Sequence, residues 1–443
     1  MDFSGFHKYT GCLPTCSPDG RHIASAEEYR LTVMEADTLQ VVQLYSCLDK
    51  IRTMEWCSRS EYIVCGLQNK QIVQVWSASD QDWTCKIDEG PAGIERCQWT
   101  PDGTHLILIA AFRIRMAIWS LLEKTCIHLP GPKFEDKGLA FSPDGTVMAL
   151  LERSECKDYI SLIAREEWRP QVHVQLLTQD AQDLCFSPSG SCLCVWDSLD
   201  YNIFIHAMDG SCLASYRAFS EPALGIRVAH WGPSGQLLAL GGFDNAVRLL
   251  DAKTWEPIAE LTHSDSPSDE AAVLFQEVEL RDRSGAQAGV ETTSVSISST
   301  SASQTLTSHF VIQSMPVKLC AGRDANRDAR FGIAGIHWSS TGRFLATHCE
   351  DMSNTVWIWE ISTKLQLVAI LQHLSAVRSF KWHPKEDKLA IVSGTSKIYV
   401  WNTLGASCIR IPGAANFQAS ELVWSTALLV ADKAKFCCAY STE

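Results

Sequence analysis

The stretch Phe141-Ser142-Pro143-Asp144-Gly145-Thr146 is repeated along the chain at nearly regular intervals. Close copies occupy residues 16–20, 99–103, 186–190 and 231–235, and weaker copies begin at Trp56, Trp338, Trp382 and Trp424. The nine first positions are therefore 16, 56, 99, 141, 186, 231, 338, 382 and 424. The steps between them are 40, 43, 42, 45, 45, 107, 44 and 42 residues, so one long step interrupts a regular period.

The six residues have the chemistry of a strand end, a tight turn and a strand start. An aromatic residue or Cys ends an apolar run, Pro presets φ in the turn, and Gly accepts the positive φ that other residues avoid. An apolar run follows each copy. A period of 40 to 45 residues is typical of a propeller blade. The sequence therefore predicts an all-β fold, a β-propeller of about nine blade units.

Each unit contains four short stretches with the period-2 apolar pattern of β-strands. In the unit around Phe141 we expect strands at Lys137–Phe141, Val147–Glu152 and Tyr159–Ala164. Val172–Leu177 is expected to lead into the following blade.

A Trp stands near the end of the third strand in four units, at Trp76, Trp119, Trp359 and Trp401. A Trp in this position is expected to pack between neighbouring blades and to bury a large apolar area. Trp followed by Asp at this point is the mark of WD repeats, but here the Asp and the Gly-His pair that usually opens a repeat are mostly missing. We interpret the chain as a divergent WD-repeat β-propeller in which these four Trp are structural.

The long step divides the chain into three parts. Residues 1–261 are expected to form blades 1 to 6, residues 262–308 a disordered insertion, and residues 309–443 the remaining blades. Residues 291–308 include 12 Ser or Thr in 18, too polar to build a core, although Ala272–Leu280 has a strand pattern. The insertion is either a tolerated surface loop or a docking segment controlled by phosphorylation. We favour a single closed ring over seven or eight blades with a divergent appendage.

Composition narrows the function classes. The net charge of −13 disfavours nucleic-acid binding, and no apolar run approaches the 18 residues of a membrane span. The 18 Cys contain no Cys-x-x-Cys pair and mostly lie in apolar strands, as in a reduced, soluble intracellular protein. No phosphate-binding loop, metal-ligand motif or nucleophile motif is present, so we expect neither a cofactor nor a metal, and no enzyme activity.

Several stretches resemble one family more specifically than the repeat does, namely Leu44–Ile51, Val73–Ser77, Trp83–Gly90, Cys156–Ser161 and Cys194–Ser198. They are similar to the centrosomal and spindle-pole WD-repeat family of the WRAP-seventy-three type, also called the WD-repeat protein eight family. The resemblance implies a scaffold in the cytoplasm and cytoskeleton, at the centrosome, microtubule-organising centre or spindle pole. It also implies a coiled-coil microtubule-anchoring partner of the SSX-interacting or Msd type, and in fungi a minus-end-directed kinesin. Tethering of microtubule minus ends, spindle assembly and cilium formation would follow from these contacts.

The family match is densest at Trp83–Gly90, so we predict partner binding through Trp83, Lys86, Asp88 and Glu89. A Trp beside charged residues in an inter-blade loop is typical of an interface anchor. The alternative is that Trp83 and Ile87 pack against the blade while Lys86 and Asp88 are solvated.

Two other functions fit a propeller of this composition. One is a substrate receptor for a ubiquitin ligase, and the other is a translation-associated or RNA-associated factor. Basic-aromatic stripes that would favour RNA are missing from the sequence. Co-purification with a ligase adaptor would support the first, and co-sedimentation with ribosomes the second.

Overall fold

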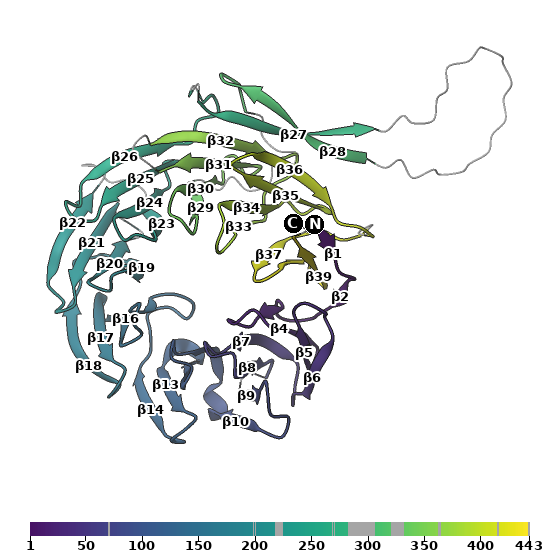
Figure 1. Ribbon diagram of the computed structural model, residues 1–443. Coiled ribbons are helices and arrows are strands. Elements are labelled where there is room, and N and C mark those ends of the chain that lie inside the picture. Colours follow the sequence, from purple (N-terminus) through teal and green to yellow (C-terminus); the bar gives the residue numbers. More distant parts are fainter. Residues whose placement is uncertain are drawn as a thin grey trace, which may run out of the picture.

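The computed structural model describes residues 1–69, 71–197, 199, 201–217, 225–267, 269, 271–281, 306–319, 332–361, 365–413 and 416–441. These residues form nine sheets that follow one another around a single ring (Figure 1). We number the nine blades in the order in which their innermost strands occur along the chain. The described residues contain no α-helix and two short 3-10 turns, η1 (Gly90–Ala92) and η2 (Ala111–Arg113).

From the innermost strand outward, blades 1 to 3 are β3 (Thr15–Cys16), β4 (His22–Glu27), β5 (Arg30–Glu35) and β6 (Val41–Ser46); β7 (Ile51–Trp56), β8 (Tyr62–Leu67), β9 (Ile72–Ser77) and β10 (Thr84–Asp88); and β11 (Ile94–Trp99), β12 (His105–Ala110), β13 (Arg115–Ser120) and β14 (Cys126–Pro130). Blades 4 to 6 are β15 (Leu139–Phe141), β16 (Val147–Ser154), β17 (Lys157–Ala164) and β18 (Arg169–Gln175); β19 (Ala181–Phe186), β20 (Cys192–Asp197), β21 (Asn202–Ala207) and β22 (Cys212–Arg217); and β23 (Ile226–Trp231), β24 (Leu237–Gly242), β25 (Ala246–Asp251) and β26 (Pro257–Thr262).

Blade 7 consists of β29 (Ile333–Trp338), β30 (Phe344–Cys349), β31 (Thr355–Glu360) and β32 (Gln366–Gln372), extended by β27 (Val273–Arg281) and β28 (Leu306–Ser314). Blade 8 consists of β33 (Ser379–Trp382), β34 (Lys388–Val392), β35 (Lys397–Asn402) and β36 (Gly405–Arg410). Blade 9 consists of β37 (Glu421–Trp424), β38 (Leu428–Ala431) and β39 (Lys435–Tyr440), completed by β1 (Asp2–Phe3) and β2 (His7–Lys8).

The repeated stretch marks the same point in every blade. Each of its nine first residues, from Cys16 to Trp424, is the last residue of the innermost strand of a blade. The turn that follows has the predicted chemistry: in blade 4, Gly145 has φ +69° and its N–H donates to the Ser142 carbonyl at 2.8 Å. A Cβ at Gly145 would lie 3.3 Å from Pro101 of the preceding blade, so the turns of neighbouring blades pack against each other.

A recurring hydrogen bond explains why so many of the innermost strands end in Trp. The indole N–H of Trp99 donates to the Glu55 carbonyl, the residue just before Trp56 of the preceding blade, at 3.2 Å. The same bond is made by Trp56 to Thr15 (3.2 Å), Trp338 to His230 (3.4 Å), Trp382 to His337 (2.8 Å) and Trp424 to Lys381 (3.0 Å). The Trp therefore registers each innermost strand against its neighbour while its ring fills the junction.

The ring is closed, as predicted. Nine clusters of buried apolar side chains lie between the blades, one at each junction. An open stack of nine blades would have only eight junctions, whereas the ninth cluster joins Ile23 of blade 1 to Phe436 of blade 9. Both chain ends meet in blade 9, where Asp2 and Phe3 pair with Tyr440 and Ala439. The expectation of nine blades in one ring is confirmed.

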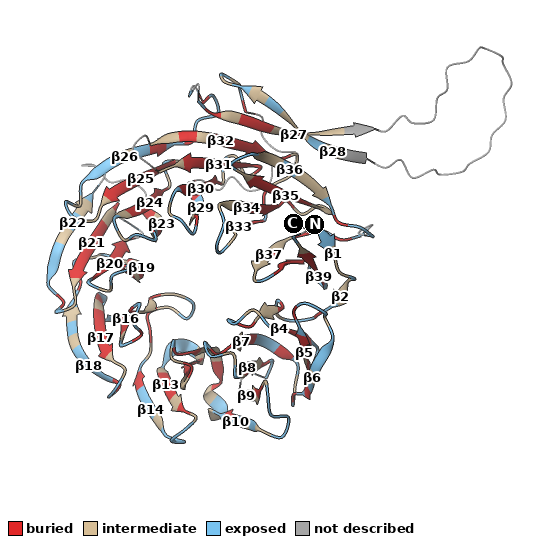
Figure 2. Ribbon diagram, viewed as in Figure 1, coloured by how far each residue is buried: buried red, intermediate tan, exposed pale blue. Residues whose placement is uncertain are grey.

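Burial follows the distance of a strand from the ring axis. The inner strands hold most of the buried residues, and the outermost strands such as β18 and β22 are largely exposed (Figure 2). Val172–Leu177, which was expected to lead into the next blade, instead lies mostly in β18, the fourth strand of its own blade. Its apolar residues Val172 and Val174 pack on blade 4 at the junction with blade 5.

The interval 262–308 differs from the expected disordered insertion. Val273–Arg281 forms β27, which pairs in parallel with β32 and in antiparallel with β28, so that blade 7 has six strands. The apolar residues of β27 account for this, since Leu274 and Phe275 are buried at the two junctions of blade 7. The Ser/Thr-rich part, residues 282–305, lies outside the described residues.

Candidate partner-binding surface

The segment Trp83–Gly90 forms the outermost strand of blade 2. Thr84–Asp88 is β10, paired with β9 over five residues, so the segment is not the inter-blade loop that we expected. Trp83 is half-buried, with its ring 4.7 Å from that of Tyr62, and Ile87 is buried. Lys86 and Asp88 are exposed and remain predicted partner contacts. The alternation that buries Ile87 and exposes its two neighbours is the pattern of an edge strand.

Glu89 lies inside the ring's own contacts. Its side chain is 5% exposed, at the junction between blades 2 and 3. The carboxylate accepts a hydrogen bond from the Trp119 indole at 2.6 Å and another from the Arg115 guanidinium at 3.1 Å. A buried carboxylate requires such partners. Glu89 therefore links blade 2 to blade 3, and the structure does not place it beside Lys86 and Asp88 as one exposed cluster.

The four Trp of the third strands lie in the junctions between blades. Trp76, Trp119, Trp359 and Trp401 each belong to the apolar cluster shared with the preceding blade. The Trp359 indole donates to the Thr347 hydroxyl at 2.9 Å, and the Trp401 ring is perpendicular to that of Trp382 at 5.9 Å. These contacts leave the four Trp inside the ring.

One face of the ring carries both the connections between blades and the turns between second and third strands. In blade 3, Ile94 pairs with Ala110 and Arg115 pairs with Pro130, which brings the start of β11, the turn after β12 and the end of β14 to one end of the sheet. We call this the connecting face. The turns of the repeated stretch lie at the opposite end, where Trp99 pairs with Leu106.

The connecting face is hollowed over blades 1 to 4. Hollow A, about 630 Å³, lies between blades 1 and 2 and is lined by Thr10, Gly11, Glu28, Lys50, Ile51, Arg52 and Gln68. Hollow B, about 700 Å³, lies between blades 3 and 4 and is lined by Glu95, Ala111, Phe112, Arg113, Phe134, Glu135 and Asp136. A gap of about 10 Å³ between blades 2 and 3 shares Arg52 with hollow A and Glu95 with hollow B. We call the three together the furrow.

Hollow B is walled by a turn with an unusual backbone. Phe112 and Arg113 both have positive φ, +60° and +57°, a conformation that costs a non-Gly residue about 1–3 kcal/mol. Phe112 is nevertheless 89% exposed and Ile114 69% exposed, so neither side chain gains burial from this geometry. The turn is held from outside, because a Cβ at Gly131 would stand 1.7 Å from the Arg113 carbonyl and the Arg113 guanidinium donates to the Lys133 carbonyl.

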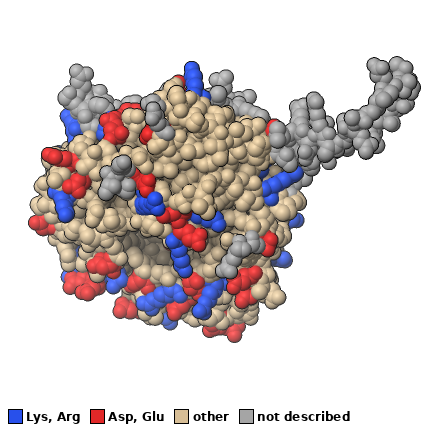
Figure 3. All heavy atoms as spheres, turned by 45° about the horizontal axis from the view of Figure 1, so that its top comes forward, with Lys and Arg blue, Asp and Glu red and all other residues tan. Residues whose placement is uncertain are grey.

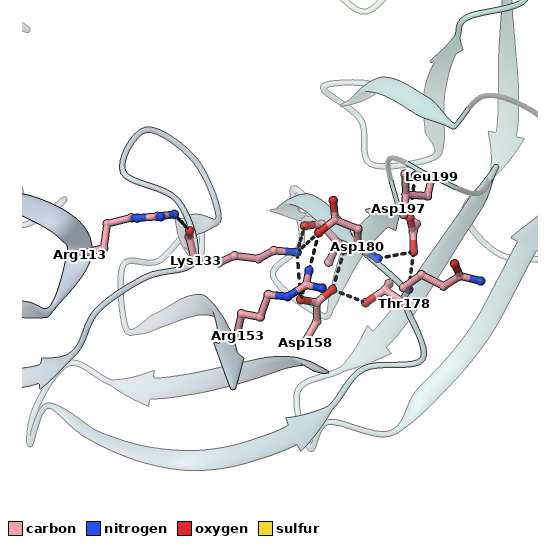
Figure 4. A network of polar contacts seen from close by, with 10 residues as sticks. Arg113, Lys133, Arg153, Asp158, Thr178, Asp180, Asp197 and Leu199 are labelled. Carbon is pink, nitrogen blue, oxygen red and sulfur yellow. Dashed lines mark hydrogen bonds and ion pairs between the residues drawn. The ribbon is translucent and has the colours of Figure 1, made fainter. Parts of the chain in front are cut away.

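The connection that carries Lys133 is itself fixed to blades 4 and 5 (Figure 4). The Lys133 ammonium is 6% exposed and bonds the Asp158 carboxylate at 2.9 Å, the Asp180 carboxylate at 2.7 Å and the Ala181 carbonyl at 2.7 Å. Arg153 adds an ion pair to Asp180 at 2.6 Å. Removing one member of a buried ion pair typically costs about 3–5 kcal/mol, so the network is a strong anchor.

Two more carboxylates fasten the same connections. Asp183 accepts a hydrogen bond from the Gly138 N–H at 2.8 Å, and burial raises the pKa of its carboxyl above the ordinary value. Asp197 accepts from the backbone N–H groups of Gln179 at 2.6 Å and Asp180 at 3.1 Å. Both ends of the connection from blade 3 to blade 4 are therefore tied down, and the walls of hollow B are preorganised.

Sequence reasoning missed the furrow, although one signal was present. Ala110-Ala111-Phe112-Arg113-Ile114 connects two strands without Gly, Pro, Asp or Asn, the residues that normally form a turn. An apolar turn of this kind points to a surface under another constraint. The acidic pair Glu135 and Asp136 lies 20 residues further along the chain, so only the fold brings it beside Phe112.

Two classes of site were also searched in the structure. Among the described residues no group of three or more His, Cys, Asp or Glu is arranged to hold a metal ion. No helix long and apolar enough to cross a membrane occurs in the part of the chain that the structure describes.

The fold and the repeat define the class of this protein: it is a WD-repeat β-propeller. Over 93% of the chain, the structure is similar to the C-terminal WD40 domain of Sif2, with a TM-score of 0.51, 14% identity and 99% of that chain covered. At this identity the likeness supports the fold alone. No family model matches the sequence.

Two relatives match nearly the whole chain. The mouse protein WD repeat-containing protein WRAP73 is 37% identical over 453 residues, covering 99% of this chain and 95% of the relative. An uncharacterised WD repeat-containing protein of Schizosaccharomyces pombe is 23% identical over 457 residues, covering 96% and 88%. The chain belongs to the WRAP73 family of WD-repeat proteins.

Proposed function

We propose that the protein is a non-enzymatic scaffold at the centrosome or spindle pole, within the cytoplasm and cytoskeleton. It binds a coiled-coil microtubule-anchoring protein of the SSX-interacting or Msd type and so tethers microtubule minus ends. A minus-end-directed kinesin is a second partner. The scaffold supports spindle assembly and, in organisms that build them, cilia.

Family membership carries this proposal. The likeness to the mouse relative extends over 99% of the chain, across all nine blades rather than over one shared repeat. A rigid ring whose blades offer many separate edges and turns suits the assembly of several proteins. The furrow provides a preorganised surface for one such protein.

The charge of the chain favours indirect attachment to microtubules. The net charge is −13, and acidic and basic side chains are interspersed over the face seen in Figure 3. Because the microtubule surface is itself acidic, direct binding to the lattice is expected to be weak. The coiled-coil partner would supply that contact.

The proposal is tested by affinity purification of the tagged full chain from dividing cells, together with imaging of the tag. We expect recovery of a coiled-coil anchoring protein and foci at the spindle poles. A diffuse signal with recovery of ribosomes or a ligase adaptor would contradict the proposal and favour one of the two other propeller functions.

A further inference from the structure

We propose that the furrow binds one linear segment of a partner protein in a single direction. The segment places an apolar side chain and neighbouring Lys or Arg in hollow B, and Asp or Glu in hollow A. This inference rests on the scaffold proposal for the view that the partner is a protein, and it adds the surface and the chemistry of the segment.

The apolar part follows from hollow B. Phe112 and Ile114 project from the turn with 89% and 69% of their surface exposed, and Phe134 forms part of the opposite wall. Exposed apolar side chains beside a hollow are typical of interfaces. A Leu, Ile or Phe of the partner would bury all three and gain about 25 cal/mol for each Å² removed from water.

The basic part follows from the charges of hollow B. Its lining contains three carboxylates, of Glu95, Glu135 and Asp136, against one guanidinium, of Arg113. The Arg113 guanidinium already donates to the Lys133 carbonyl. The exposed carboxylates of Glu135 and Asp136 have no ion-pair partner among the described residues. They are available for a Lys or Arg of the partner.

Nearby cations do not neutralise this rim. The Lys133 ammonium is committed to Asp158 and Asp180, and the Lys137 ammonium stands 4.5 Å from the centre of the Phe134 ring. The lining of hollow B therefore remains acidic.

Hollow A has the opposite balance. It is lined by Lys50 and Arg52 against one carboxylate, of Glu28, which lies 3.7 Å from Lys50 with both side chains more than half exposed. Arg52 pairs with Glu95 at 3.5 Å across the gap between the hollows. Exposed ion pairs of this kind contribute about 0–1 kcal/mol, so acidic groups of a partner can replace them at little cost. The sign change along the furrow sets the direction of the segment.

The walls need little rearrangement on binding. The turn of Phe112 is held by Gly131 and Lys133, and the connection after it by Asp158 and Asp180. Binding to a surface already in place avoids part of the ordering cost that weakens flexible interfaces.

The test begins with the full chain as bait for a displayed library of random 16-residue peptides. The peptides selected are synthesised with a fluorescent label and titrated with the full chain, and binding is followed by fluorescence anisotropy. We expect them to share an apolar residue flanked by Lys or Arg, with Asp or Glu at one side only. Selection of peptides without this order would overturn the inference.

Substitutions then locate the site. Phe112→Ser with Ile114→Ser, and separately Glu135→Lys with Asp136→Lys, are each expected to weaken binding at least 10-fold, with unchanged circular dichroism and thermal midpoint. Lys86→Glu with Asp88→Lys on β10 is the matched control and is expected to leave binding unchanged. A furrow variant that binds as tightly as the wild type would contradict the proposal.

Charge reversal gives a second, positive readout. A peptide whose Lys or Arg residues are changed to Glu is expected to bind the Glu135→Lys, Asp136→Lys variant more tightly than it binds the wild type. If furrow variants lose the peptides but the purified wild type brings down no anchoring protein, the furrow stands and the scaffold proposal fails. If furrow variants still recover that protein in full, the scaffold stands and this inference fails.

Discussion

Two regions of the ring use their charged residues in opposite ways. At the junction of blades 7 and 8, the Glu277 side chain on β27 is 1% exposed and is fully engaged. Its carboxylate accepts hydrogen bonds from the Tyr399 hydroxyl at 2.8 Å and the Leu374 N–H at 3.0 Å, and pairs with Lys397 at 3.2 Å. In the furrow, Glu135 and Asp136 are exposed to solvent and pair with no described residue.

The difference arises from one added element rather than from the repeat. The β27–β28 hairpin covers the outer edge of blade 7 and brings Glu277 against β35 of blade 8. Burial alone would raise the pKa of Glu277, but the bonds from Leu374 and Tyr399 and the charges of His373 and Lys397 lower it below its ordinary value. A covered junction thus uses its charges for stability, whereas the uncovered furrow keeps them available for binding.

The largest expected effect is the removal of the Glu277 carboxylate. Glu277→Ala leaves the Lys397 ammonium, whose side chain is 12% exposed, without its buried partner. We expect a loss of about 3–5 kcal/mol in the free energy of unfolding, measured by chemical denaturation. Glu279→Ala is the control, because Glu279 pairs with the same Lys397 at 3.3 Å from a 26% exposed position. Equal losses in the two variants would show that burial does not distinguish the pairs.

The second effect is a loss of stability in acid on the same side of the ring. Burial lowers the pKa values of His263, His337 and His373 to about 4. Between pH 6.5 and 4 the unfolded chain then binds more protons than the folded one, so the free energy of unfolding falls as the pH falls. From pH 7 to pH 5, one such His accounts for about 2 kcal/mol.

His373→Leu isolates one share of this dependence. Both ring nitrogens of His373 lack a hydrogen-bond partner among the described residues, so an apolar replacement is expected to cost little at pH 7. The variant should lose about 2 kcal/mol less than the wild type between pH 7 and pH 5 in denaturation curves. An unchanged pH dependence would contradict the assignment to this residue.

The fold could be predicted from the sequence to a large extent because its determinants are local. The turn of Phe141 to Thr146 recurs with the same Pro and Gly, and the last residue of every innermost strand was fixed by it. The hairpin of β27 and β28 was harder, since its strands are separated by 24 residues outside the described structure, and its pairing with β32 is non-local.

The candidate surface was less predictable. Trp83 and Ile87 followed a plain strand pattern, but Glu89 depends on Trp119 and Arg115 of the next blade, 30 and 26 residues away. Whether a carboxylate is exposed or buried is decided by such contacts between blades. Sequence order alone does not contain them.

The smallest expected effect on stability is in the furrow. Phe112→Ser removes an 89% exposed side chain, so we expect a change in the free energy of unfolding within about 0.5 kcal/mol. Thermal denaturation beside Glu277→Ala sharpens the contrast between the two regions. A loss of more than 2 kcal/mol would mean that Phe112 supports the fold.

The most direct test of the account is hydrogen exchange of the full chain, with and without the coiled-coil protein recovered with it, read by mass spectrometry. The account predicts slower exchange on binding in residues 47–52, 110–115 and 131–138, with β10 and blades 6 to 8 unchanged. Slower exchange in β10 or blades 6 to 8, with the furrow unchanged, would contradict it.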